Sequence, residues 1–206
     1  MVRTDNGLIS VERRHRLEVA SSLAKAFQSD PLYSYVLPDE KKRAKALLWL
    51  MQKVVDYSVL YGKGLTTHLS EGGIFWLPPG QTKLTLLRIF RTGLYGIVFR
   101  FGIISYGKFS DNMSYTDEIH ERFATDPHWY LWAIGVNPSF QGKGIGSKLM
   151  QPVLNIADKS HLPCYLETHN EHNIRFYENH GFMVVNEGRI PKHHLRVWAM
   201  LRRSQY

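Results

Sequence analysis

The stretch WYLWAIGVNPSFQGKGIGS, residues 129–147, decides the fold of this 206-residue chain. Residues 129–136 are apolar and aromatic, which predicts a buried strand, and an apolar face predicts a helix over about Ile145–Ser160. Glycines in the loop between them let backbone amides converge beside the positive end of that helix, where an anion can bind. We predict a phosphate cradle here, with a turn that only connects the two elements as the alternative.

The spacing of the glycines separates this loop from two common phosphate-binding motifs. A P-loop needs Ser or Thr after Gly-Lys, but Lys143 is followed by Gly144. The dinucleotide fingerprint G-x-G-x-x-G directly follows its strand, whereas here a G-x-G-x-G pattern begins five residues later. Glu167 lies at a suitable distance along the chain for a ribose contact, so a dinucleotide fold remains a minor alternative.

Further motifs surround the loop in a fixed order. Val136-Asn137-Pro138 precedes Gln141-x-x-Gly144-x-Gly146, and Asn173 and the stretch FYENHGF at 176–182 follow. In this order and spacing the motifs resemble the GCN5-related N-acetyltransferase (GNAT) superfamily. The resemblance is strongest in the carboxyl-terminal third, where residues 129–198 are most similar to puromycin N-acetyltransferases. Residues 83–126 depart from that family, so puromycin itself is not carried over as a substrate.

Strand and helix patterns along the chain agree with this resemblance. We expect one domain over 1–206, an α/β fold with a mixed, mostly antiparallel sheet flanked by helices, and a helical insertion at 83–126 before the acetyl-CoA-binding strand. The predicted strands are 7–13, 65–70, 73–77, 129–136, 164–168, 182–186 and 195–201. The predicted helices are 14–28, one capped by Asp39 that ends near Gly62, 113–123, 145–160 and 171–180.

The resemblance implies acetyl-CoA as co-substrate and assigns roles to residues. The cofactor would lie against Ile134, Val136, Gln141, Gly142, Lys143, Gly144, Gly146, Ser147 and Asn173. Tyr177 would be the general acid that protonates the departing thiolate, with a core tyrosine as the alternative. Glu167 would be the general base, with a structural carboxylate as the alternative. Tyr33 and Tyr35, in the loop after the first helix, and Trp76 would line the acceptor site, although core packing also explains them.

Composition excludes several classes of protein. One cysteine, Cys164, allows neither an internal disulfide framework nor a cysteine-rich zinc site. Residues 1–14 lack the apolar core of a secretory signal, and the longest apolar stretch, 94–106, is interrupted by Arg100 and too short to span a bilayer. We therefore expect a soluble, cytoplasmic protein.

Metal and nucleic-acid sites are not expected. His169 and His172 have no third ligand at a suitable spacing, and His193-His194 should lie exposed in a turn, so we predict no metal. The formal charge of +8 comes from dispersed basic residues without a nucleic-acid-binding motif, so we predict no nucleic-acid partner. The basic, apolar stretch within 83–108 could lie on a membrane surface, but we expect it to pack on its own domain and predict no membrane contact.

The predicted function is acetyl-CoA-dependent transfer of an acetyl group to a primary amine of a small molecule, by direct attack on the thioester. Two alternatives remain open: a module that binds or senses acyl-CoA without turnover, and an acetyltransferase that acts on protein amino groups. The identity of the acceptor, the acyl-chain preference, the role of 83–126 and a homodimeric state are left undetermined.

Overall fold

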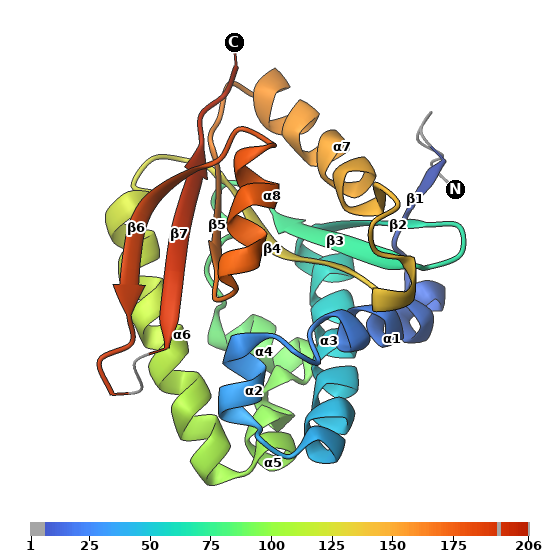
Figure 1. Ribbon diagram of the computed structural model, residues 1–206, viewed down its shortest axis with the longest axis vertical. Coiled ribbons are helices and arrows are strands. Elements are labelled where there is room, and N and C mark those ends of the chain that lie inside the picture. Colours follow the sequence, from blue (N-terminus) through green and yellow to red (C-terminus); the bar gives the residue numbers. More distant parts are fainter. Residues whose placement is uncertain (1–6, 193–194, 206) are drawn as a thin grey trace.

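The computed structural model describes residues 7–192 and 195–205, and within them one sheet has seven strands in the order β1-β2-β3-β4-β5-β7-β6 (Figure 1). All neighbouring strands are antiparallel except β4 and β5, which confirms a mixed, mostly antiparallel sheet. The strands are β1 Leu8–Ser10, β2 Lys63–Thr67, β3 Gly72–Leu77, β4 Trp129–Val136, β5 Cys164–Thr168, β6 Met183–Arg189 and β7 Arg196–Arg202. The expected exposed pair His193-His194 lies outside the described residues.

Eight α-helices and four short 3-10 helices accompany the sheet in the described part of the chain. The α-helices are α1 Arg16–Ala26, α2 Pro31–Val36, α3 Glu40–Tyr61, α4 Leu86–Thr92, α5 Ile97–Phe101, α6 Ile103–Phe123, α7 Ile145–Lys159 and α8 Ile174–Glu178. The 3-10 helices are η1 Arg13–His15, η2 Leu94–Gly96, η3 Pro138–Phe140 and η4 Glu171–Asn173. Among these residues, no helix is both long enough and apolar enough to cross a membrane.

Several elements differ from the sequence expectation. The strand predicted at 7–13 is only Leu8–Ser10, and the helix predicted at 171–180 is η4 followed by the short α8. The helix predicted at 113–123 begins earlier, because α6 runs without interruption from Ile103. The expected loop after α1 contains α2, since Asp30 is its N-cap: the Asp30 side chain accepts a hydrogen bond of 2.9 Å from the Leu32 amide. Pro31 at the first helical position fits there because it needs no amide partner.

Helices cover both faces of the sheet. On one face, α7 and α8 pack against Ile74, Trp76 and Leu166 within one apolar core. On the other, α1 and α3 pack against Phe75 and Leu77 of β3, and α6 covers β5 and β7 near Tyr165. This alternation along β3 places Trp76 on the α7 side and its neighbours on the α3 side.

The sheet opens between its two parallel strands. β4 and β5 pair only at their first residues, Trp129 with Cys164 and Tyr130 with Tyr165. Beyond these pairs the strands diverge, and α8 lies beside the opening while α2 to α5 gather below it in Figure 1. The edge of β4 that faces β5 therefore leaves backbone groups without a strand partner at residues 132–136. A ligand can pair with them there.

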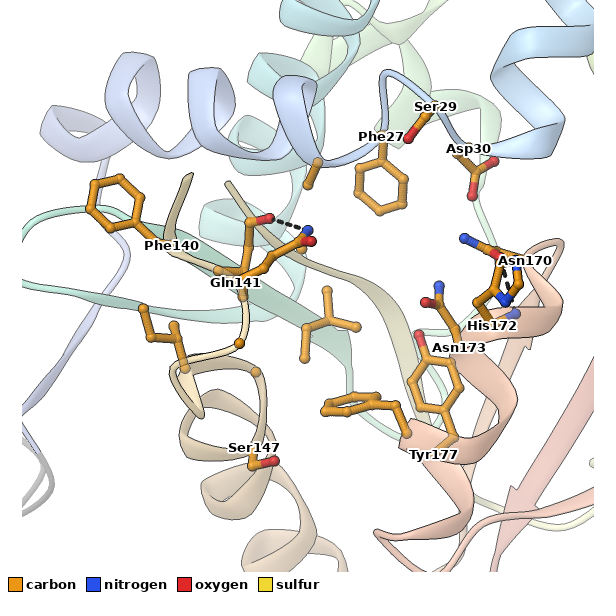
Figure 2. A pocket seen from close by; sticks show the side chains of 18 of the residues that line it. Phe27, Ser29, Asp30, Phe140, Gln141, Ser147, Asn170, His172, Asn173 and Tyr177 are labelled. Carbon is orange, nitrogen blue, oxygen red and sulfur yellow. Dashed lines mark hydrogen bonds between the residues drawn. The ribbon is translucent and has the colours of Figure 1, made fainter. Parts of the chain in front are cut away.

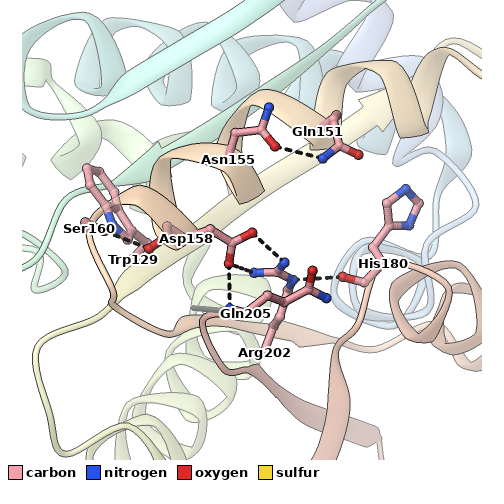
Figure 3. A network of polar contacts seen from close by, with 9 residues as sticks. Trp129, Gln151, Asn155, Asp158, Ser160, His180, Arg202 and Gln205 are labelled. Atoms are coloured by element: carbon pink, nitrogen blue, oxygen red, sulfur yellow. Dashed lines mark hydrogen bonds and ion pairs between the residues drawn. The ribbon is translucent and has the colours of Figure 1, made fainter.

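A buried ion pair fastens the end of β7 to the end of α7 (Figure 3). The Arg202 guanidinium donates to both Asp158 carboxylate oxygens, at 2.7 and 2.8 Å, and its Nε donates to the His180 carbonyl. The Gln205 amide donates to the same carboxylate at 3.0 Å. Both charged side chains are buried, and the Arg202 hydrogen bonds hold the pKa of Asp158 below its usual range.

We predict that Arg202→Met lowers the free energy of unfolding by about 3 kcal/mol, because it leaves a buried carboxylate without its counter-charge. The double variant Asp158→Leu/Arg202→Met should recover part of this loss, and the exposed neighbour Arg203→Met should cost little. Urea denaturation measures all three. The wild-type pair stabilises the fold above about pH 4, the ordinary carboxyl pKa, and that contribution should fade as pH falls through the lower folded pKa. A Met variant as stable as the Arg203→Met control would contradict the argument.

Candidate active site

The predicted phosphate cradle has the required backbone geometry. Gly142 and Gly144 have φ of 75° and 76°, in the left-handed region that favours glycine, and no atom lies within 4 Å of where a Cβ would stand. The first helical hydrogen bond of α7 runs from the Lys148 amide to the Gly144 carbonyl, so the amides of residues 145–147 have no partner within the helix. The Gln141 side chain donates to the Val136 carbonyl at 2.9 Å and ties this loop to β4.

An open cleft of about 560 Å³ lies over the loop (Figure 2). All but one of the residues predicted to contact the cofactor line it: Ile134, Val136, Gln141, Gly142, Gly144, Gly146, Ser147 and Asn173. Lys143 is the exception, since its ammonium lies 5.2 Å from the centre of the Phe140 ring instead. The structure thus brings a loop, a helix N-terminus and a strand edge together around one cavity.

A second, smaller cavity of about 190 Å³ adjoins the first. Its wall is largely apolar, with Leu50, Met51, Val54, Leu94, Ile97, Phe109, Met113 and Trp132 among the lining residues. Tyr33, which was predicted for the acceptor site, lines this cavity. Tyr35 does not, because its ring packs under the Lys108 ammonium, 4.4 Å away. Trp76 is also misplaced by the prediction: it is 2% exposed and faces α7, on the opposite side of the sheet from the α3 residues that line the cavity.

The two cavities meet at a shared boundary. Phe27, Asp30, Ile134, Asn173 and Tyr177 line both of them. Figure 2 shows the Asp30 carboxylate and the Phe27 ring entering from the α1–α2 turn, while Asn173 and Tyr177 point toward the same space from the α8 side. A group bound in one cavity can therefore reach a group bound in the other beside a carboxyl and a phenol.

Asp30 is a site residue that the sequence did not reveal. Burial raises its pKa to about 6, against the opposing effect of hydrogen bonds from the Leu32 and Tyr33 amides. Its sequence context, an Asp-Pro pair after a helix, signals a helix end and carries no chemical signature. Only its position within the loop already assigned to the acceptor side could have suggested it.

Tyr177 and Asn173 are brought together as their spacing predicts. Asn173 ends η4 and is the N-cap residue of α8, and Tyr177 follows on that helix. Tyr177 is 7% exposed, and burial, with a further effect of the nearby Asp30, raises its pKa above the ordinary value. Its hydroxyl therefore keeps its proton across the physiological range and is available as a donor.

Glu167 lines the smaller cavity and does not line the larger cleft. Its carboxylate accepts a hydrogen bond of 2.8 Å from the Tyr130 hydroxyl, and His120 Nδ1 lies 3.8 Å from its other oxygen. Burial raises the pKa of Glu167 to about 7. Its expected position beside the donor site stays a prediction: Glu167 lines the smaller cavity, which shares Asn173 and Tyr177 with the larger cleft.

Helix α6 contributes polar neighbours that the sequence could not place. Asn112 Oδ1 lies 2.7 Å from His169 Nε2, and burial lowers the pKa of His169 to about 4, so its ring is neutral. His120 and His128 contact each other through their Nε2 atoms at 2.7 Å. Over the described ranges no group of three His, Cys, Asp or Glu residues could hold a metal ion.

Comparisons with known proteins agree with this geometry. Residues 90–182 match the model of the acetyltransferase (GNAT) family. An uncharacterised N-acetyltransferase of Schizosaccharomyces pombe is 30% identical over 181 residues, which cover 84% of this chain and 72% of that protein. The chain belongs to the GNAT family of N-acetyltransferases, as its motifs predicted.

Solved structures share the fold across nearly the whole chain. A Corynebacterium glutamicum structure described as histone acetyltransferase and related acetyltransferase has a TM-score of 0.65 at 18% identity, and 97% of this chain and 96% of that one are covered. A Drosophila melanogaster polyamine N-acetyltransferase, described as forming N-acetylagmatine, has a TM-score of 0.60 at 13% identity, with 95% and 98% covered. At these identities the likeness concerns the fold.

Proposed function

We propose that this protein is an acetyl-CoA-dependent N-acetyltransferase for the primary amine of a small molecule with an apolar body. The observation that carries the proposal is the meeting of the two cavities at Asp30 and Tyr177. The larger one has converging amides and an open strand edge, and the smaller one has apolar walls and a carboxylate at its mouth. The polyamine acetyltransferase among the structural neighbours supports a small amine as acceptor.

The residues present fit acetyl-CoA. Unpartnered amides at residues 145–147 and the left-handed glycines before them would hold its pyrophosphate, and the free edge of β4 would pair with its pantetheine. Bound there, acetyl-CoA supplies an activated acetyl thioester. A β4 amide near Val136 would donate to the thioester oxygen as charge develops on it.

The boundary residues divide the proton transfers between them. Asp30, ionised above about pH 6, would hold the acceptor's ammonium and take its proton, which leaves a neutral amine able to attack. Tyr177 would give its proton to the departing thiolate. The attacking nitrogen carries a positive charge after the attack, and the proton that it loses as the amide forms would restore the Tyr177 hydroxyl. Glu167 remains the alternative base, but its hydrogen bond from Tyr130 and its distance from the donor cleft favour a supporting role on the acceptor side.

The proposal is tested by incubating the protein with acetyl-CoA and a panel of primary amines and detecting free CoA thiol. The panel should include arylalkylamines, polyamines and a lysine-containing peptide. We expect acetyl-CoA to raise the melting temperature and apolar monoamines to give the highest kcat/KM. Stabilisation without turnover on any amine would favour an acyl-CoA sensor, and turnover confined to the peptide would favour protein acetylation. No stabilisation by any acyl-CoA would contradict both.

The proposed location is the cytoplasm, where acetyl-CoA and reduced thiols are available. The only cysteine, Cys164, is free and buried, which is compatible with that location.

A further inference from the structure

Exposed apolar side chains are concentrated in one short part of the chain. Within the described residues, eight of the fourteen large apolar side chains that are exposed lie in the segment 84–104, here called the apolar–basic segment. They are Leu84, Leu86, Leu87, Phe90, Tyr95, Phe99, Ile103 and Ile104. Exposure reaches 86% at Phe99 and 82% at Ile103, so these two residues lie mostly in solvent. Where exposed apolar side chains form one patch on a folded protein, they mark an interaction surface.

The exposed side chains cannot fold into the core, because other side chains of the same segment already occupy the space beneath it. Leu94, Ile97 and Phe101 are buried in the core shared with α1 and α3. Close approach to α3 depends on glycine: a Cβ at Gly96 would lie 3.0 Å from the Trp49 ring. The segment is therefore fixed against the protein, with a second apolar side facing outward.

The charges on this segment all have one sign. Between Gly72 and Ser110 the sequence has no Asp or Glu, but it has Lys83, Arg88, Arg91, Arg100 and Lys108. Arg91 and Arg100 are exposed among the apolar side chains, and neither forms an ion pair with any residue that the structure describes. A partner for this surface must therefore accept apolar side chains and supply negative charge.

We propose that the apolar–basic segment binds the surface of an anionic lipid bilayer. Phe99, Ile103 and their neighbours would enter the boundary between headgroups and acyl chains, while Arg91 and Arg100 contact lipid phosphates. A second copy of the chain is a poorer partner, because a two-fold contact on this surface would bring its own cations together without any acidic residue of the segment to offset them.

This proposal revises the sequence expectation that the segment packs on its own domain without membrane contact. The sequence shows apolar residues on several sides of short helices, and such residues fit a buried layer as well as an exposed surface. The structure buries one set and leaves the other in solvent.

Vesicle co-sedimentation tests the proposal with the full chain. We expect sedimentation with vesicles of phosphatidylcholine and phosphatidylserine in equal amounts, release at high salt, and little sedimentation with phosphatidylcholine alone. Phe99→Ser/Ile104→Ser should lower the partition coefficient at least tenfold. Arg91→Gln/Arg100→Gln should lower it roughly fivefold for each charge.

Matched controls distinguish vesicle binding by this surface from non-specific adsorption to vesicles. Leu17→Ser/Leu69→Ser removes two side chains that are 63% and 80% exposed on other elements, and should leave sedimentation unchanged. Circular dichroism and melting temperature establish that each variant is folded, which the exposure of the replaced side chains leads us to expect. Failure of the wild type to sediment with anionic vesicles, or equal sedimentation of the Phe99→Ser/Ile104→Ser variant, would overturn the proposal.

A fluorescent label locates the contact on the molecule. Cys164 is buried, and burial raises the pKa of its thiol to about 12, so a cysteine introduced by Ile103→Cys should be labelled selectively. A polarity-sensitive dye there should shift to the blue with anionic vesicles, whereas the dye on Leu69→Cys should not. Light scattering tests whether the protein self-associates. If the wild type is a dimer and Phe99→Ser/Ile104→Ser is a monomer, the surface binds a second copy of the chain, and the lipid proposal is overturned.

Discussion

Asp30→Asn should lower kcat/KM by roughly a hundredfold to ten-thousandfold at pH 8, the range typical of a lost general base. In the proposed mechanism, the carboxylate at the boundary of the two cavities pairs with the ammonium and accepts its proton, and an uncharged amide cannot replace it in either role. Asparagine is as good an N-cap as aspartate, so α2 and its first hydrogen bond should remain. A melting temperature close to the wild type would establish that the loss is chemical.

The pH profile identifies which carboxyl group acts. The ratio of wild-type to variant kcat/KM cancels the ionisation of the free amine. For Asp30→Asn this ratio should rise with pH and level off above about 6, because only the ionised carboxylate is active. If Glu167 is the base instead, Glu167→Gln should lower kcat/KM more than Asp30→Asn does. The ratio of wild-type to Glu167→Gln kcat/KM should then level off only above about pH 7. A flat ratio for Asp30→Asn would exclude its role as base.

Tyr177→Phe should lower kcat by about a hundredfold or more, because the departing thiolate loses its proton donor. Phenylalanine preserves the ring contacts with Phe176 and Phe182, whose centroids lie 5.3 and 6.0 Å away, so KM for acetyl-CoA should change little. Steady-state kinetics with thiol detection measure both constants.

Two comparisons distinguish an acid from a packing residue at position 177. Tyr61→Phe, at the end of α3 and outside both cavities, removes a hydroxyl without touching the site and should leave kcat unchanged. An acetyl thioester with a more acidic thiol needs less protonation, so it should narrow the gap between Tyr177→Phe and the wild type. An unchanged gap would point to a role in positioning, and an unchanged kcat would remove Tyr177 from the chemistry.

The cradle could be predicted from the sequence because its geometry is local. The strand before it, the glycines and the first turn of α7 are consecutive residues, and left-handed φ values at Gly142 and Gly144 follow from residue type. Periodicity similarly predicted β5 at its observed bounds, and the motif order identified the family. Asn173 and Tyr177 shared a cavity because one turn of chain separates them.

The acceptor side could not be predicted, because its residues come from elements far apart in the chain. Asp30 meets Tyr177 only where β4 and β5 diverge, and no local pattern encodes that divergence. Trp76 shows the same limit: alternation predicts that it and Phe75 face opposite sides of the sheet, but not that both are buried in the two cores and line neither cavity.

The sequence by itself therefore determined the family, the backbone geometry of the glycine loop and the position of Tyr177 on its helix, since backbone conformation and helical spacing depend on near neighbours. Only the tertiary structure decided where the proposed acceptor cavity lies, which carboxylate stands where it meets the larger cleft, and which apolar side chains of residues 84–104 face solvent. The physical reason is that burial depends on what the rest of the chain brings against a residue. Leu94 and Phe99 are both apolar, but the rest of the chain packs around Leu94 and leaves Phe99 in solvent.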